Sequence, residues 1–205
     1  MFLSELIEAL SEESTIMMCG LPASGKSTVA KLISQAKGHT ILNTDMIRLR
    51  IYDKEEIFDS QKASDLRRRY MVYDVMFKTA KELIMKGERV ILDGTFVRQE
   101  LRVKAVEILG ILLPNFYLIQ TICGESTILE RIHNRQNKEY ESNAITQEAY
   151  FNNLKIWEDV DILELRNKVS STKFSLFQVI STDSDPLTWE VKGVIQKKDL
   201  VHAWE

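Results

Sequence analysis

The sequence predicts an α/β fold in which a five-stranded, mostly parallel sheet is flanked by helices. Short apolar runs alternate with longer segments whose apolar residues recur at helical spacing. A glycine-rich loop, residues 20–28, lies between the first apolar run and the first helical segment. Strands that alternate with helices in this way are typical of parallel sheets with right-handed crossovers. No internal repeat or linker-like tract divides the 205 residues, so we expect one domain over residues 1–205.

The first half of the chain supplies the elements around this loop. Residues 3–12 form an amphipathic pattern that predicts a short outer helix, and residues 15–19 form a buried strand. Residues 29–36 have helical spacing, residues 39–43 read as a second strand, and residues 46–51 as a short helix. We expect an exposed connection over residues 52–62, followed by a long helix over residues 63–86 that Gly87 can end.

The second half continues the alternation. Strands are predicted over residues 89–95, 115–123 and 174–181, where β-branched, aromatic and other apolar residues gather. Helices are predicted over residues 99–109, 125–137 and 146–163, the last with acidic residues in its first turn. After a turn at residues 183–186, a final helix-like segment is expected over residues 187–200.

The composition is that of a globular protein, with 44% hydrophobic and 28% charged residues. The formal net charge of −3 gives no overall basic field, so nucleic acid is a possible partner that charge does not indicate. Cys19 and Cys123 lie in apolar runs and are expected to be core residues of a cytoplasmic protein. Acidic residues near Met1 and the lack of a long apolar run argue against a signal peptide and a membrane span. Composition leaves the oligomeric state open.

The glycine-rich loop matches the phosphate-binding pattern G-x-x-x-x-G-K-[ST] at every position. Its glycines permit backbone angles that turn several N–H groups towards one anion, and the following helix adds the positive end of its dipole. Lys26 is expected to reach the β- and γ-phosphates of ATP, and Ser27 to bind Mg²⁺. The predicted cofactor-binding residues are Gly20, Leu21, Pro22, Ala23, Ser24, Gly25, Lys26, Ser27 and Thr28 of the loop, together with Arg131 from the later basic helix end.

The second strand ends at Asp45, and Arg48 follows three residues later on the same helical face. In a parallel sheet, functional residues gather beyond the carboxyl ends of the strands. Asp45 could take a proton from a hydroxyl acceptor there, while Arg48 holds an anionic group of that acceptor. An aspartate that only caps the helix, with an arginine at the surface, is the alternative interpretation.

The third strand ends at Asp93, with Thr95 just beyond it. An acid after an apolar strand is the second acidic element of phosphate-loop enzymes, and it could bind a Mg²⁺ water or hydrogen-bond Ser27. Asp93 and Thr95 are therefore candidate contacts for the substrates. Arg102, on the next helix, could face the acceptor or solvent. We expect residues 46–75 and 96–102 to wall the acceptor pocket.

A basic helix end follows the fourth strand, where Arg131 and Arg135 lie four residues apart on one face. A guanidinium over a transferring phosphoryl group stabilises its charge, so residues 125–143 could form a lid that closes over ATP. A solvated basic helix end is the plainer alternative. Three adjacent arginines, Arg67 to Arg69, point in different directions on their helix and are not expected to form one nucleic-acid patch.

Together these segments resemble the P-loop kinase branch that contains polynucleotide kinases and zeta toxins, with bacterial kinases of unassigned substrate most alike. The resemblance covers residues 14–183 and rests on the phosphate loop, residues 43–48, residues 87–96 with Arg102, and residues 131–135. It implies transfer of the γ-phosphoryl group of ATP to a hydroxyl. It also implies that Asp45 is the general base, Arg48 the clamp for an acceptor phosphate, and Arg135 the lid arginine.

Two positions depart from the polynucleotide kinase pattern, because Met46 stands where a second acid is common and Phe96 where asparagine is common. The acceptor therefore stays open among nucleic-acid ends, nucleotides, sugars and other small molecules. A different class is a nucleotide-dependent binding module or switch that hydrolyses ATP without an acceptor. ATP turnover with and without candidate acceptors separates the two, because only a kinase is stimulated.

Overall fold

The fold is described from a computed structural model, which defines residues 1–52, 66–136, 146–169 and 171–194. A six-stranded sheet has the order β2-β3-β1-β4-β5-β6. All strand pairs are parallel except β5 with β6. The strands are β1 (Ser14–Cys19), β2 (Thr40–Asn43), β3 (Val90–Asp93), β4 (Asn115–Ile122), β5 (Lys173–Ile180) and β6 (Glu190–Val194). The predicted α/β class and parallel core are confirmed.

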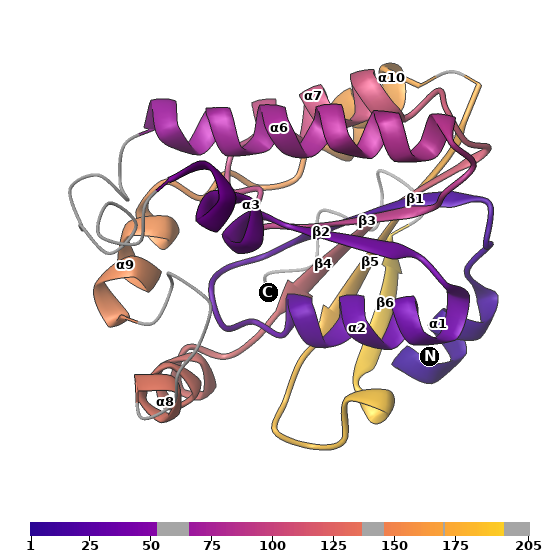
Figure 1. The fold of residues 1–205 in the computed structure, drawn as a ribbon. Helices are drawn as coiled ribbons and strands as arrows, with labels where there is room; N and C mark the ends of the chain where they lie inside the picture. The colour runs from indigo at the N-terminus through magenta and orange to yellow at the C-terminus, as the bar shows by residue number, and fades with distance from the viewer. Residues whose placement is uncertain (53–65, 137–145, 170, 195–205) are drawn as a thin grey trace.

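Helices cover both faces of this sheet, as Figure 1 shows, with α6, α7 and α10 on one face and α1 and α2 on the other. The helices are α1 (Leu3–Ala9), α2 (Lys26–Lys37), α3 (Thr44–Ile51), α6 (Leu66–Met85), α7 (Gln99–Leu109), α8 (Glu125–Gln136), α9 (Gln147–Lys155) and α10 (Ile162–Asn167). A 3-10 turn, η1 (Pro186–Thr188), precedes β6. No helix in the described ranges is long and apolar enough to cross a membrane.

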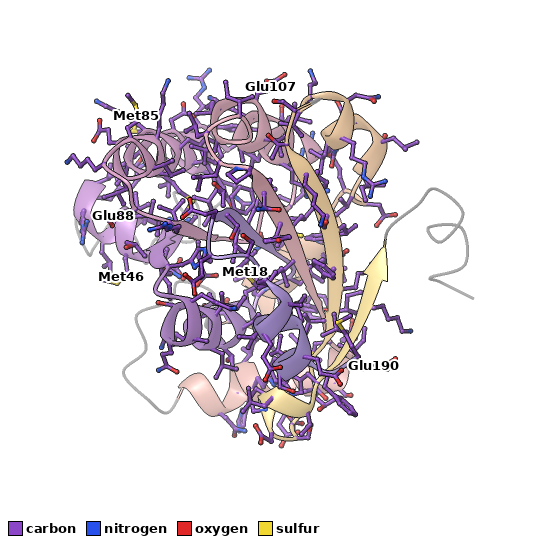
Figure 2. The ribbon with its side chains drawn as sticks, turned by 90° about the vertical axis from the view of Figure 1, so that its right-hand side faces the viewer. Met18, Met46, Met85, Glu88, Glu107 and Glu190 are labelled. Carbon is purple, nitrogen blue, oxygen red and sulfur yellow. The ribbon has the colours of Figure 1, made fainter. Side chains whose placement is uncertain are left out.

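Strand β1 runs through the middle of both cores. All six of its residues are buried, which fits a central parallel strand that is covered on both faces. Met17 and Cys19 pack on the side of α6 and α7, while Ile16 and Met18 pack on the side of α1 and α2. In Figure 2, Met18 lies within the sheet, below the helices that carry Met85 and Glu107.

The last element differs from the prediction. Residues 187–200 were expected to be helical, but the described part forms η1 and the antiparallel strand β6, which starts at Glu190 in Figure 2. Residues 195–200 lie outside the described residues. The strand gains its partners from both sides, because β5 pairs with it and the N-terminal segment bonds to its start. Val191 N–H donates to the Met1 carbonyl at 2.8 Å, and Leu3 N–H donates to the Trp189 carbonyl at 2.9 Å.

The predicted helix over residues 146–163 is two helices, α9 and α10. Asp161 explains the break, since its carboxylate accepts from the backbone N–H groups of Leu163 and Glu164 and starts α10 as an N-cap. The connection between the two helices is also held from outside by Arg102. Most of the predicted connection at residues 52–62, and the end of the predicted lid at residues 137–143, lie outside the described residues.

The parallel strands β1 to β4 direct their carboxyl ends to one end of the molecule. Helices α3, α8 and α9 and the start of α2 gather there, at the left of Figure 1. Helices α8 and α9 pack through Ile128, Ile132 and Tyr150 against Ala23 of the phosphate loop. The topology therefore places the loop between the sheet and these two helices.

Candidate active site

The phosphate loop has the backbone that its glycines were predicted to allow. Gly20 has a φ of 142° and Gly25 a φ of 98°, both in the range that favours glycine. Close packing also requires glycine at both positions. A Cβ at Gly20 would lie 2.6 Å from the Thr121 carbonyl oxygen, and one at Gly25 would lie 2.9 Å from the indole of Trp189. The loop thus fits closely between β4 and the segment before β6.

Two polar side chains of the loop are held in place. Lys26 is only 9% exposed, and its Nζ donates to the Leu21 carbonyl at 2.8 Å, so the side chain bends back over its own loop. Ser24 and Thr121 hydroxyls lie 2.6 Å apart and join the loop to β4. This arrangement directs a cation to the side of the loop where phosphates bind in phosphate-loop proteins.

Asp93 joins the loop to the neighbouring strand end. Its carboxylate is 2% exposed, and one oxygen accepts from Ser27 Oγ at 2.8 Å and from Asn43 Nδ2 at 2.8 Å. A hydroxyl and a carboxylate that meet at the mouth of a phosphate loop are oxygen ligands of the kind that Mg²⁺ takes with substrate phosphates. Within the described ranges no group of three His, Cys, Asp or Glu side chains could hold a metal alone. The residues present therefore fit a Mg²⁺ ion that arrives with a nucleotide.

Asp45 and Arg48 form a pair at the end of β2. Arg48 Nη1 lies 2.7 Å from Asp45 Oδ1, and both side chains are partly exposed, at 21% and 24%. Asp45 is not the cap of α3, because the Asn43 side chain accepts from the backbone N–H groups of Asp45 and Met46. The interpretation of Asp45 as a helix-capping residue is therefore wrong, and its carboxylate is held by the arginine instead.

Thr95 borders the same region, two residues after the end of β3. Its carbonyl accepts from Gly20 N–H at 3.2 Å, and its hydroxyl lies 3.4 Å from the Tyr73 hydroxyl. Tyr73 also accepts from the Phe96 N–H at 2.9 Å, and burial raises the pKa of its phenol. Phe96 has a φ of 45°, an uncommon angle for a side chain of this size, which the bond from its N–H to Tyr73 helps to hold.

Arg131 of α8 lies over the phosphate loop. Its guanidinium donates to the Ala23 carbonyl at 3.1 Å and to Ser181 Oγ at 3.0 Å, and it pairs with Asp183 at 3.2 Å. The same group lies 5.8 Å from the centre of the Trp189 ring. Arg131 thus joins α8, the loop and the segment after β5. Arg135 belongs to the last turn of α8, but its side chain lies outside the described residues.

Arg102 does not occupy the position expected of an acceptor contact. Its side chain is 0% exposed, and it donates to the carbonyls of Phe96 at 2.8 Å, Glu158 at 2.6 Å and Asp159 at 3.0 Å. Its guanidinium also lies 4.8 Å from the centre of the Trp157 ring. The prediction that Arg102 binds substrate is therefore not supported by its position, and the residue joins two loops inside the protein. The sequence alone places it on a helix near the site, which does not reveal its inward direction.

Two cysteines, Cys19 and Cys123, lie near the site. Both are free, and burial raises the pKa of the Cys19 thiol to about 11, so that this thiol stays neutral in the core. Cys123 is partly exposed, and its sulfur accepts a contact from Arg131 Nη1 at 3.4 Å. The raised pKa of the Cys19 thiol is the opposite of what marks a reactive nucleophile.

Comparison with known proteins identifies the family of the chain. Residues 15–154 match the family model described as an AAA domain. The chain belongs to that AAA domain family. No curated protein matches the chain in sequence.

Solved structures similar to this AAA domain include kinases. A gluconokinase from Sinorhizobium meliloti 1021 has 18% identity and a TM-score of 0.52, with 82% of this chain and 84% of that chain covered. A sugar kinase from Janibacter sp. HTCC2649 has 14% identity and a TM-score of 0.58, with 81% and 84% covered. Kti12 from Chaetomium thermophilum, in complex with ADP-AlF3, has 18% identity and a TM-score of 0.58, with 83% and 90% covered. These likenesses show a P-loop kinase-like fold, broader than the branch of polynucleotide kinases and zeta toxins.

Several residues that complete the site of this AAA domain were not predicted as site residues. Asn43, Tyr73, Thr121 and Trp189 all contact the loops that hold predicted residues. Asn43 carried a signal, because it ends a predicted strand two residues before Asp45. Trp189 carried none, since its segment was expected to be helical and it meets the loop only through the tertiary fold.

Proposed function

We propose that this chain is an ATP-dependent kinase that transfers the γ-phosphoryl group to a hydroxyl of an acceptor molecule. One observation carries the proposal. A continuous set of hydrogen bonds runs from Ser27 Oγ to Asp93, from Asp93 to the Asn43 amide, and from that amide to the backbone of Asp45. The residue suited to a metal and the residue suited to a base are therefore positioned by the same network.

The phosphate loop is the part that we assign to ATP. Residues 20–28 would surround the phosphates, with Lys26 moving from the Leu21 carbonyl to the β- and γ-phosphates. Ser27 and Asp93 are the residues that would hold Mg²⁺, directly or through water, and the ion would neutralise charge on the phosphates. Arg131, already bonded to the loop at Ala23, would steady the loop against α8.

Asp45 is the residue that we assign to the acceptor. Its carboxylate accepts the proton of the acceptor hydroxyl while that oxygen forms a bond to the γ-phosphorus and the bond to the β-phosphate oxygen breaks. ADP leaves with the electron pair of the broken bond. Arg48 keeps the carboxylate oriented through the contact at 2.7 Å. Arg135 is assigned to the lid of residues 125–143, where it would stabilise the transferring group.

The alternative of a switch without an acceptor makes a different prediction in one assay. Phosphorylation of a panel of sugars, sugar acids, nucleosides and 5′-hydroxyl oligonucleotides is measured with labelled ATP. We expect at least one class to stimulate ATP turnover, Lys26→Ala to abolish turnover, and Asp45→Asn to lower transfer by about 10²–10⁴ while MgATP still binds. ATP hydrolysis that no acceptor stimulates would support the switch and refute the kinase.

The Asp45 variant also tests the base assignment itself. Its folding is checked by circular dichroism, and its MgADP affinity by calorimetry. Loss of nucleotide affinity in Asp45→Asn would make Asp45 a metal or structural residue, and the role of base would pass to Asp93.

A further inference from the structure

One arginine beside the site lacks the partner that its burial requires. Arg69 lies on α6, and its Nη1 is buried with no hydrogen-bond partner among the residues that the structure describes. An arginine side chain stays protonated in proteins, so a buried N–H of this kind loses water without compensation. Such a cost persists where a ligand supplies the missing acceptor.

Arg102 shows what a purely structural buried arginine looks like in this protein. Its guanidinium is surrounded by carbonyl oxygens from two loops and by the Trp157 ring. The arginines next to Arg69 also have other surroundings, because Arg67 is exposed and the Arg68 guanidinium lies 4.6 Å from the centre of the Tyr52 ring. Within the Arg67–Arg69 run, Arg69 is thus the residue with a buried donor, Nη1, that has no acceptor among the described residues.

Arg69 lies one helical turn before Tyr73, on the same face of α6. The Tyr73 hydroxyl lies beside the end of β3, within 3.1 Å of the place where a Gly94 Cβ would be, and it accepts from the Phe96 N–H. Helix α3, which carries Asp45 and Arg48, packs against α6. Arg69 therefore faces the region between α3, α6 and the end of β3.

Arg48 approaches the same region. Burial lowers the pKa of the Arg69 guanidinium, and the positive charge of Arg48 lowers it further. Arg48 has Asp45 as a counter-ion, and no carboxylate among the described residues pairs with Arg69. Two guanidinium groups that are near enough to affect each other in a partly buried place favour a bound anion.

We propose that Arg48 and Arg69 together bind an anionic group of the phosphoryl acceptor, which makes the acceptor a small hydroxyl-bearing carboxylate or phosphate ester. The proposal rests on the proposed kinase function and narrows its substrate class. The anion held by the two arginines presents the hydroxyl to Asp45, on the side of the site opposite the phosphate loop. Neutral sugars and nucleosides lack this group and bind more weakly.

Anion binding is tested apart from phosphoryl transfer. The protein is first saturated with MgADP so that the phosphate loop is occupied, and it is then titrated with inorganic phosphate, with gluconate and with the neutral polyol glucitol, with binding followed by calorimetry. We expect phosphate or gluconate to bind and glucitol not to bind. The two anions distinguish a phosphate-type from a carboxylate-type acceptor.

Substitutions assign that binding to Arg69. Arg69→Gln should weaken anion binding about ten- to a hundredfold, since it removes a charge-assisted hydrogen bond, and Arg69→Lys should restore part of it. Arg67→Gln and Arg50→Gln, at exposed positions of the same two helices, should leave it unchanged. Arg69→Met should melt at or above the wild-type temperature, because it removes a partly buried cation whose Nη1 has no hydrogen-bond partner among the described residues. If Arg69 had only a structural role, the Arg69→Met variant would have a melting temperature below that of the wild type.

The outcomes separate this proposal from the kinase proposal. If Arg69→Gln binds both anions like the wild type, or if the wild type binds neither, the anion site is refuted. If neutral acceptors are phosphorylated as well as their acidic analogues, the anion site is refuted and the kinase stands. If anions bind through Arg69 and no acceptor is phosphorylated, the binding site stands and the kinase is refuted.

Discussion

Replacing Arg102 with methionine should destabilise the protein by about 3 kcal/mol. The variant removes three short hydrogen bonds to backbone carbonyls, of 2.6, 2.8 and 3.0 Å, each with a net value of about 1 kcal/mol. It also removes the contact with the Trp157 ring, of about 0.5–1 kcal/mol, and relief of the buried charge offsets part of the loss. Methionine keeps most of the volume, so the loss reports the polar contacts.

Urea unfolding followed by circular dichroism measures this change. Lys104→Met is the matched control on the same helix, because the half-exposed Lys104 side chain pairs with Asp74 at 2.5 Å. It should change the stability by less than about 1 kcal/mol. Arg102→Lys should rescue little, since an ammonium group cannot spread its donors over two loops as the planar guanidinium does. A loss below about 1 kcal/mol in Arg102→Met, together with a raised acceptor KM, would refute the structural role and return Arg102 to substrate binding.

Three further predictions address the lid, the loop and the core. Arg135→Ala should lower kcat more than it raises the ATP KM, because its contact strengthens as charge develops; equal binding and rate in steady-state kinetics would contradict the lid. Gly25→Ala should weaken MgADP at least about tenfold in calorimetry, as its Cβ would meet an indole, whereas Gly38→Ala, where space is open, should bind normally. Burial lowers the pKa of His39 in the folded protein. Below about pH 6.5 the unfolded chain therefore binds more protons than the folded chain, and the free energy of unfolding decreases as the pH is lowered, by up to about 1.4 kcal/mol per pH unit. His39→Gln should flatten the melting temperature between pH 8 and 5, and His133→Gln, at an exposed position, should not.

The core of the fold was predictable because its signals are local. Strand β1, the phosphate loop and α2 follow one another in a short stretch, and each has the apolar spacing or turn residues of its own conformation. Helix α7 was predicted with the bounds that it has. The predicted residues Ser27 and Asp93 do meet, since strands β1 and β3 are neighbours in the sheet.

The errors arose where distant parts of the chain decide the conformation. Residues 190–194 form a strand because β5 and the N-terminal segment offer them hydrogen bonds, and no local pattern shows those partners. The break between α9 and α10 depends on Asp161 as a cap and on carbonyls that Arg102 binds from another helix. The inward turn of Arg69 depends on how α6 packs against α3, which helical periodicity alone could not place.

The residues that pack against the phosphate loop lie far from it in the sequence, so the site can form only late in translation. The loop's sequence is translated early, but Gly25 packs against Trp189 and Ser181, which a ribosome synthesises much later. Trp189 is held in turn by a backbone bond from Leu3, so the two ends of the described chain meet beside the loop. A nascent chain that stops before Trp189 would therefore carry the full phosphate-binding motif without the finished site. The ability to bind a nucleotide would then indicate that synthesis has passed Trp189, just before strand β6.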